Sequence, residues 1–443
     1  LEYKYTRAYD HNEAIGYIRS NDYRLLLIDM RFDQNSCEKF LQIALKDYPN
    51  LGIIAIIDQD HIEKIRSLQE FELDSIINYP IESDDLFLRL KEVRTHTELM
   101  EEVGVIGRTQ EIRNIISTII QIASTNVTVF ITGESGTGKE VMAKAIHYSS
   151  SRRFKPFVAI NCGAIAESLL ESELFGYEKG AFTGAVSRTR GKFEYADKGT
   201  LFLDEVGEMS VNTQIKFLRV LEEREFMRVG GNENIHVDVR VITATNADLE
   251  EGIKNGTFRR DLFYRLKVFS IKIPPLRERK KDIPLLINAF IEKFKKDHDL
   301  NFKGLTTEAY EKMKQYDWPG NIRELRNLVE SFVILQPKNQ ISGSDIESYL
   351  YSRKPNEEFF QARQQYNGQT LPVFVNKPVD QVEREMIFQA VRKLHNDIQE
   401  LKSIVLEKFE DTEKKKNSDN QFQPIFDTQI NLDIGLPMRE IEK

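Results

Sequence analysis

The segment "FITGESGTGKEVMAKAIHYS" constrains the fold more than any other part of the chain. An apolar strand pattern runs directly into a G-x-x-x-x-G-K loop, and a helical pattern follows the lysine without a break. Such a loop surrounds phosphate oxygens with backbone N–H groups and a helix N-terminus, while its lysine neutralises the outer phosphates. The sequence therefore predicts an α/β fold with a nucleotide site, and a glycine-rich turn without a ligand is the alternative. The predicted nucleotide-binding residues of this loop are Gly133, Glu134, Ser135, Gly136, Thr137, Gly138, Lys139 and Glu140.

An acidic pair follows a second apolar strand pattern, in "LFLDEV". Asp204 is expected to hold Mg²⁺, and Glu205 to polarise the attacking water. The hydroxyl residue that usually follows the lysine of such a loop is replaced by Glu140, so the metal must depend on other groups. Taken alone the pair could be an ordinary strand end, but together with the phosphate loop it predicts hydrolysis of a bound nucleotide.

Hydrolysis also needs positive charge near the γ-phosphate. The segment "FRRDLFYRL" offers Arg259, Arg260 and Arg265. Because it lies far along the chain from the phosphate loop, these arginines are candidates for reaching the nucleotide of a neighbouring subunit. A solvated basic helix face is an equally good interpretation of their spacing alone.

The stretch "EKGAFTGAVS" places one aromatic residue among glycines and alanines. Phe182 has no apolar neighbour at helical or strand spacing, and Gly180 and Gly184 disfavour a helix. The pattern favours an exposed contact on a mobile loop, with a ring folded back onto its own domain as the alternative.

Alternating strand and helix patterns predict parallel sheets with helices on both faces. We expect a doubly wound sheet over 1–100, an α/β domain over 104–350 whose helical lid occupies about 278–350, and a linker and helical region over 351–443. The strands of the second domain are predicted at 127–132, 157–161, 199–205, 239–246 and 268–274. In the first region we predict strands at 3–9, 23–30 and 51–58, helices at 12–21, 37–48 and 83–103, and a continuation of the alternation at 61–71 and 74–79.

The composition limits the functional classes. A net charge of -8 over 443 residues gives no overall attraction for nucleic acid, so any polyanion must bind a local site. The two cysteines, Cys37 and Cys162, lie outside metal-ligand spacing and indicate a reducing, cytoplasmic setting. No apolar run is long enough for a membrane span, so a membrane role is not expected.

Taken together, the motifs resemble the AAA+ domain of the NtrC-like bacterial enhancer-binding proteins, which activate the sigma-54 form of RNA polymerase. The resemblance covers roughly residues 104–350 and rests on "GESGTGKE", "ESELFGYEKGAFTGA", "GTLFLDEVGEMS", "FRRDLFYRL" and "WPGNIRELRN". It implies a five-stranded P-loop ATPase with a helical lid that assembles into a homo-oligomeric ring, a hexamer or heptamer. It also implies that ATP hydrolysis with Mg²⁺ remodels the closed promoter complex of sigma-54 RNA polymerase.

The resemblance assigns roles to matching residues around the nucleotide. Asn161 matches the asparagine that restrains the catalytic glutamate, and Asn246 matches the first sensor of the γ-phosphate. Arg323 matches the lid sensor. Glu140 is the residue that the family itself carries after the lysine, so its presence is expected there.

The resemblance also assigns residues that contact another molecule, either a neighbouring subunit of the ring or the sigma factor. Arg259 and Arg265 match the finger arginines supplied across the ring interface, which leaves Arg260 as a neighbour without a role. The predicted contact with the sigma factor is the loop formed by Gly180, Ala181, Phe182, Thr183, Gly184 and Ala185.

The first hundred residues resemble a response-regulator receiver. Asp29 matches the phosphorylated aspartate, which implies a two-component system with a sensor kinase. The resemblance begins at the family's second strand, so the acidic magnesium pair is not in this sequence. Ile57 and Asp58 stand where the switch hydroxyl is expected, and Tyr79 stands where the lysine before Pro80 is expected. A structural aspartate that ends a buried strand is the alternative for Asp29.

The carboxyl-terminal part departs from the family pattern. Relatives end in a helix-turn-helix that binds enhancer DNA, and no such helix pair follows residue 350, although "LPMREIEK" resembles the linker that leads into it. An amphipathic helix is expected at 379–410, as a packing helix or a short coiled coil. Two other functions stay open at this point: another AAA+ remodelling ATPase, or a nucleotide-sensing regulator or scaffold that does not act on sigma-54.

Overall fold

The computed structural model describes residues 4–20, 23–31, 34–48, 51–58, 71, 73–335 and 340–353. The helix expected at 379–410 lies outside the described residues, as does nearly all of the segment at 61–71. Among the helices that are described, none combines the length and apolar character needed to cross a membrane.

The amino-terminal region contains a three-stranded parallel sheet in the order β1-β2-β3. Helices α1 and α2 contribute to an apolar cluster with the first two strands, whereas Val93 of α4 packs with Ile54 and Ile77 in a second cluster. The expected strand at 3–9 is wrong, because residues 4–9 form no strand and Tyr5 is almost fully exposed. The elements are α1 (His11–Ser20), β1 (Leu25–Asp29), α2 (Gln34–Asp47), β2 (Gly52–Asp58), β3 (Ser75–Tyr79) and α4 (Ser83–Val103).

The second region is built on a five-stranded sheet in the order β12-β4-β11-β8-β5, with every pair parallel. Each expected strand of this domain is confirmed. The strands are β4 (Val129–Thr132), β5 (Phe157–Asn161), β8 (Thr200–Asp204), β11 (Arg240–Thr245) and β12 (Phe269–Lys272). The central ones are nearly continuous runs of buried residues, as parallel strands covered on both faces require. Parallel order brings the carboxyl ends of β4, β11 and β8 to one edge, where the phosphate loop begins.

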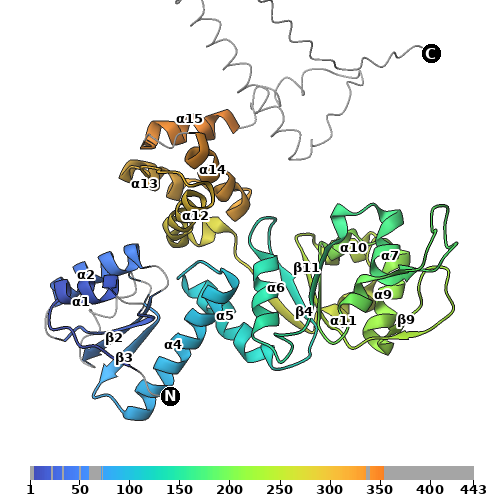
Figure 1. Cartoon of the computed structure of the whole chain (residues 1–443), viewed down its shortest axis with the longest axis horizontal. Helices are drawn as coiled ribbons and strands as arrows, with labels where there is room; N and C mark the ends of the chain where they lie inside the picture. Colours follow the sequence, from blue (N-terminus) through green and yellow to red (C-terminus); the bar gives the residue numbers. More distant parts are fainter. Residues whose placement is uncertain are drawn as a thin grey trace, which may run out of the picture. The chain divides into compact units, whose positions relative to one another are not determined.

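The helices around this sheet follow the apolar spacing of the sequence. Helix α5 shows it most clearly, since Ile112, Ile116 and Ile119 recur on its buried face. Figure 1 shows α6 alongside β4 and β11. These helices are α5 (Gln110–Ala123), α6 (Lys139–Tyr148), α7 (Glu167–Phe175), α8 (Lys192–Tyr195), α9 (Val211–Glu223), α10 (Leu249–Lys254) and α11 (Arg260–Leu266).

Two short antiparallel hairpins interrupt the α/β pattern, and periodicity did not reveal either. One pairs β6 (Gly176–Tyr177) with β7 (Thr189–Arg190), and the other pairs β9 (Glu225–Phe226) with β10 (Ile235–His236). The paired segments are only two residues long, so they carry too few side chains for an alternating signal. The first hairpin carries the loop that contains Phe182.

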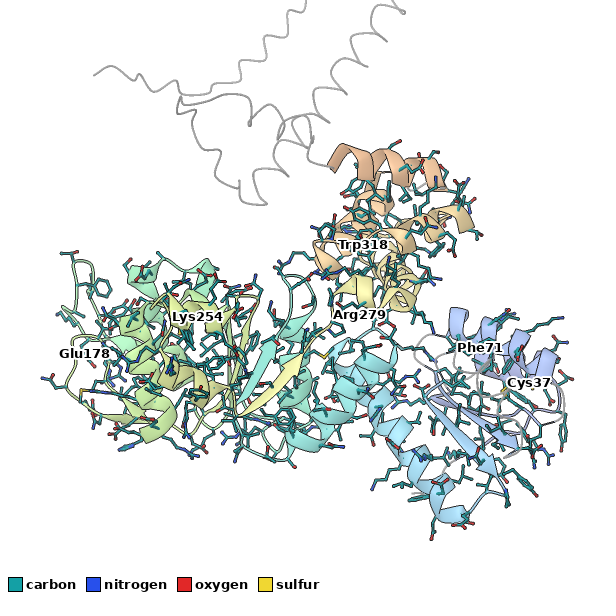
Figure 2. The ribbon with its side chains drawn as sticks, turned by 180° about the vertical axis from the view of Figure 1, so that it is seen from behind. Cys37, Phe71, Glu178, Lys254, Arg279 and Trp318 are labelled. Carbon is teal, nitrogen blue, oxygen red and sulfur yellow. The ribbon has the colours of Figure 1, made fainter. Side chains whose placement is uncertain are left out.

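The lid is a helical bundle made of α12 (Ile283–His298), α13 (Thr307–Gln315), α14 (Asn321–Leu335) and α15 (Gly343–Arg353). Its core surrounds Trp318, which is fully buried and whose indole N–H donates to the carbonyl of Met313 at 2.7 Å. Figure 2 labels Trp318 inside this bundle and Arg279 where the chain enters it.

Candidate active site

The phosphate loop connects β4 to α6, and its backbone conformation depends on glycine. Gly136 and Gly138 have φ angles of 77° and 103°, which residues other than glycine rarely adopt. Lys139 is buried at the first position of α6, and its Nζ donates back to the carbonyl oxygens of Gly133 at 3.1 Å and Glu134 at 3.4 Å. The loop thus holds an ammonium group beside a helix N-terminus, an arrangement suited to phosphate.

The acidic pair lies at the end of β8, next to this loop. Asp204 accepts the N–H of Glu205 at 3.0 Å, and burial raises the pKa of its carboxyl. Glu205 has a φ of 52°, an unusual backbone conformation of the kind found at functional sites. Its Oε1 lies 3.7 Å from Lys139 Nζ, and its Oε2 accepts the N–H of Asn246 at 3.3 Å. The structure therefore brings together the predicted lysine, acidic pair and sensor asparagine.

Asn161 ends β5 directly opposite Asp204 in the strand register. Its carboxamide oxygen accepts the N–H groups of Gly163 at 2.9 Å and Ala164 at 3.1 Å, so the side chain closes its own turn. The contacts of Glu205 go instead to Lys139 and Asn246. The structure thus places Asn161 beside the acidic pair without a hydrogen bond between the described side chains of Asn161 and Glu205.

The lid reaches the phosphate loop through Arg323, the residue that the resemblance assigns as the lid sensor. On α14, its Nη1 donates to Ser135 Oγ at 3.1 Å. Glu140 points along the outer face of α6, where it pairs with Lys144 at 2.8 Å. The carboxylate of Glu140, the residue after Lys139, is therefore engaged in an ion pair on the helix surface.

The three candidate arginines lie at and within α11. Arg259 binds the carboxylate of Asp261 through two nitrogens, at 3.1 and 2.6 Å, and Arg265 Nη2 donates to the carbonyl of Leu221 at 3.0 Å. Within the described chain, the hydrogen bonds of these two arginines do not reach the phosphate loop or the acidic pair of the same subunit.

The loop at 180–185 is the tip of the first hairpin. Gly180 and Gly184 have φ angles of 84° and 109°, and Gly180 N–H donates to the carbonyl of Ala185 at 2.9 Å. Phe182 is 41% exposed, and its ring meets the edge of Tyr177 at a centroid distance of 5.0 Å. The ring is therefore partly exposed with one aromatic neighbour, which the hairpin supplies and linear spacing did not indicate.

Asp29 ends β1 and is held by a residue two positions away. Arg31 donates to both of its carboxylate oxygens, at 2.9 and 2.8 Å, and this hydrogen-bonded guanidinium lowers the pKa of the Asp29 carboxyl. The same guanidinium lies 3.9 Å above the ring of Tyr79, the residue at the expected lysine position.

Sequence reasoning missed three residues that contact the phosphate loop, two in the segment that leads into the lid and one in α14. Arg277 binds the Glu134 carboxylate at 2.6 and 2.8 Å, Arg279 donates to the carbonyl of Thr137, and Asn321 donates to Glu134 and Ser135. The available signal was the position of Asn321 two residues before Arg323 in "WPGNIREL".

Comparisons with known proteins agree with this geometry. Residues 105–272 match the family described as Sigma-54 interaction domain, and residues 277–362 match the AAA+ ATPase lid domain. The transcriptional regulatory protein ZraR of Escherichia coli is 38% identical over 401 residues, which cover 88% of each chain. The Nif-specific regulatory protein of Herbaspirillum seropedicae is 54% identical over 227 residues, covering 51% of this chain and 42% of that protein.

Solved structures of a related regulator share the architecture. NtrX from Brucella abortus in complex with ADP is 33% identical, with a TM-score of 0.53, over 81% of this chain and 82% of that one. NtrX in complex with ATP is 32% identical, with the same TM-score and coverage. The predicted fold class and the predicted AAA+ ATPase activity are thereby confirmed. The chain belongs to the family of sigma-54-dependent AAA+ transcriptional activators of the response-regulator type, with a receiver-like amino-terminal region.

Proposed function

We propose that this protein hydrolyses ATP in a homo-oligomeric ring and uses the hairpin tip at 180–185 to remodel the closed promoter complex of sigma-54 RNA polymerase. The observation that carries the proposal is that one α/β domain combines the Lys139–Glu205–Asn246 site with the glycine-bounded Phe182 tip. The first supplies hydrolysis, and the second supplies a contact for a partner.

Within the site, each group has a separate task. Lys139 binds the outer phosphates, and Glu205 orients and polarises the attacking water. The backbone N–H of Asn246 already fixes one oxygen of Glu205, which supports a role for the Asn246 segment in aligning that base. Asn161 would restrain Glu205 in one nucleotide state and release it in another, because its strand position is opposite Asp204.

Asp204 is the residue that fits a Mg²⁺ ion. It is half-buried at the end of β8 beside the phosphate loop, and carboxylate oxygen is the ligand type that Mg²⁺ prefers. Within the part of the chain that the structure describes, no group of three acidic, His or Cys side chains gathers as a metal site. This suits Mg²⁺, which takes one or two carboxylates and completes its shell with phosphate and water. The bound ion would neutralise phosphate charge.

Arg259 and Arg265 are proposed to act on the nucleotide of the adjoining subunit. Their side-chain hydrogen bonds go to Asp261 and Leu221 and not to the phosphate loop or the acidic pair of their own chain. Positive charge supplied in trans would stabilise the leaving phosphate and make hydrolysis depend on ring assembly, as a hexamer or heptamer.

The amino- and carboxyl-terminal regions complete the proposal. Asp29 would receive a phosphoryl group from a sensor kinase, and enhancer DNA would bind through a carboxyl-terminal module that is not seen in this sequence. The protein would work in the cytoplasm, since its target is the transcription machinery.

A trapped complex tests the proposal most directly. Purified protein, sigma-54 and an ATP transition-state analogue should form a stable complex, and Phe182→Ala should abolish it while ATPase activity stays within about two-fold. Val186→Ala, at another exposed position of the same hairpin, is the matched control. A complex that survives Phe182→Ala would favour a different AAA+ remodelling target. Promoter activation that survives Glu205→Gln would favour a nucleotide-sensing scaffold.

A further inference from the structure

Asn321 is a fully buried polar residue at the start of α14 that joins three segments of the chain. Its Oδ1 accepts the N–H of Leu276 at 2.8 Å. Its Nδ2 donates to Glu134 Oε2 at 3.1 Å and to the carbonyl of Ser135 at 3.0 Å. One carboxamide therefore ties the entrance of the lid to two successive residues of the phosphate loop, with both of its ends satisfied.

Neighbouring contacts continue the attachment along the loop. Arg277 holds the Glu134 carboxylate with a bidentate pair, and the N–H of Ile322 donates to the carbonyl of Gly136 at 3.0 Å. Arg279, which is buried, donates to the carbonyl of Thr137 at 2.9 Å. The lid thus contacts four consecutive loop residues, 134 to 137, and these are the residues that must present N–H groups to phosphate.

The local geometry leaves little freedom for a different residue at this point. Asn321 has a φ of 53°, which asparagine tolerates better than most side chains. A Cβ on Gly136 would come within 2.4 Å of the carbonyl oxygen of Gly320, so loop and lid backbones are in direct contact. Aspartate would fit the same space but could not donate to Glu134 or to the Ser135 carbonyl.

We infer that Asn321, assisted by Arg277, is a positioning residue that holds the phosphate loop in its nucleotide-binding conformation and makes the lid part of the phosphate site. The inference deepens the proposed function and rests on the assignment of 133–140 as the ATP loop. Asn321 and Arg277 do not touch Asp204 or Glu205 by any hydrogen bond of the described chain, so they set nucleotide affinity rather than the hydrolytic step.

The experiment compares KM for ATP, kcat, and the Kd of a fluorescent ATP analogue in Asn321→Asp and the wild type. We expect KM and Kd to rise about ten-fold or more, because a buried donor is lost and a second carboxylate faces Glu134, while kcat changes less than about three-fold. Asn327→Asp, the same change about two turns along α14, is the matched control and should leave all three values unchanged. A fall in kcat of about ten-fold or more with no change in KM would overturn the inference.

A second substitution separates positioning from general damage to the lid. In the Asn321→Asp background, Glu134→Gln places a donor opposite the introduced carboxylate and should recover part of the lost affinity. If the effects of Asn321→Asp and Glu134→Gln on ATP affinity simply add, the inference is contradicted, because the two residues would then not be coupled.

Two further variants keep the test decisive. If Asn321→Asp does not fold, Arg277→Ala at its half-exposed site should still raise KM several-fold, and an unchanged KM overturns the inference. Lys139→Ala must abolish ATP binding. If it does while the Asn321 and Arg277 variants bind ATP normally, the inference fails and the ATP site stands; if Lys139→Ala binds ATP, the proposed site itself fails.

Discussion

Two parallel sheets of this chain each end a strand in an aspartate that the sequence marks as functional. Asp29 ends β1 and Asp204 ends β8, but their surroundings differ. A guanidinium two residues away neutralises Asp29 and lowers the pKa of its carboxyl. Burial raises the pKa of the Asp204 carboxyl, and its hydrogen bond comes from the backbone of Glu205. Asp29 already pairs with the cationic side chain of Arg31, whereas the cation proposed for Asp204 is a Mg²⁺ ion.

The largest expected effect sharpens this contrast. Glu205→Gln and Asp204→Asn should each lower kcat for ATP hydrolysis by about 10³-fold, because they remove the proposed general base and the proposed metal ligand. Asp29→Asn is the matched control at the other strand end and should change kcat less than two-fold. Phosphate release under saturating ATP measures all three. A large loss in Asp29→Asn would show that the two sites are not separate.

The next effect concerns the arginines of α11. Arg259→Ala and Arg265→Ala should each reduce hydrolysis by roughly 10²-fold in the assembled protein, since the proposed role of each arginine is to stabilise the negative charge of the leaving phosphate with its positive charge. Arg260→Ala is the control on the same helix and should stay near the wild type. Mixing Arg265→Ala with Lys139→Ala protein should restore part of the activity, because each supplies what the other lacks across an interface. Failure of every mixture to recover activity would contradict action in trans.

The sequence was sufficient for the parts of the molecule that follow a period or a motif. All five strands of the ATPase sheet and the helix at 83–103 could be predicted, because buried strands and amphipathic helices repeat their apolar residues. The hairpin beneath Phe182 could not, because Tyr177 meets that ring only after the chain turns. The strand predicted at 3–9 is the opposite error. Residues 4–9 pair with no neighbouring strand of the described chain, and a strand-like pattern alone does not form a strand.

The same reasoning explains which site residues were predictable. Asp204 and Glu205 lie at the end of β8, and Lys139 begins α6 directly after the glycine loop, so all three fall within recognisable motifs. Asn321 and Arg277 come from a different subdomain, and only the packing of the lid onto Gly136 brings them to the loop. The Arg31 pair with Asp29 was overlooked because a single arginine two residues after an aspartate has no specific spacing.

A smaller effect tests whether Arg31 shields Asp29 from phosphorylation. With acetyl phosphate and Mg²⁺, Arg31→Ala protein should be labelled on Asp29 several-fold faster than the wild type, because the carboxylate loses two hydrogen bonds to a competing cation. Intact mass and peptide mapping measure the label, and Asp29→Asn provides the blank. Equal rates in both proteins would mean that the ion pair opens freely and does not distinguish Asp29 from an ordinary phosphorylation site.

The smallest effect is thermodynamic and depends on pH. Because the pKa of Asp29 is lowered in the folded protein, its ion pair stabilises the fold above the pKa of an unfolded aspartate, about 3.9, and this stabilisation is lost as the pH falls through the lower folded value. Arg31→Ala should therefore lower the Tm of the amino-terminal region slightly at pH 7, on the order of 1 °C, because partly exposed ion pairs contribute little. The difference from the wild type should shrink towards pH 3.

Arg24→Ala, which breaks an exposed pair with Glu98 in the same region, is the control for general loss of charge. A Tm difference that grew on acidification would mean that Arg31 stabilises the sheet through its contact with Tyr79 rather than through the carboxylate, and the contrast between the two aspartates would then lie in packing and not in charge.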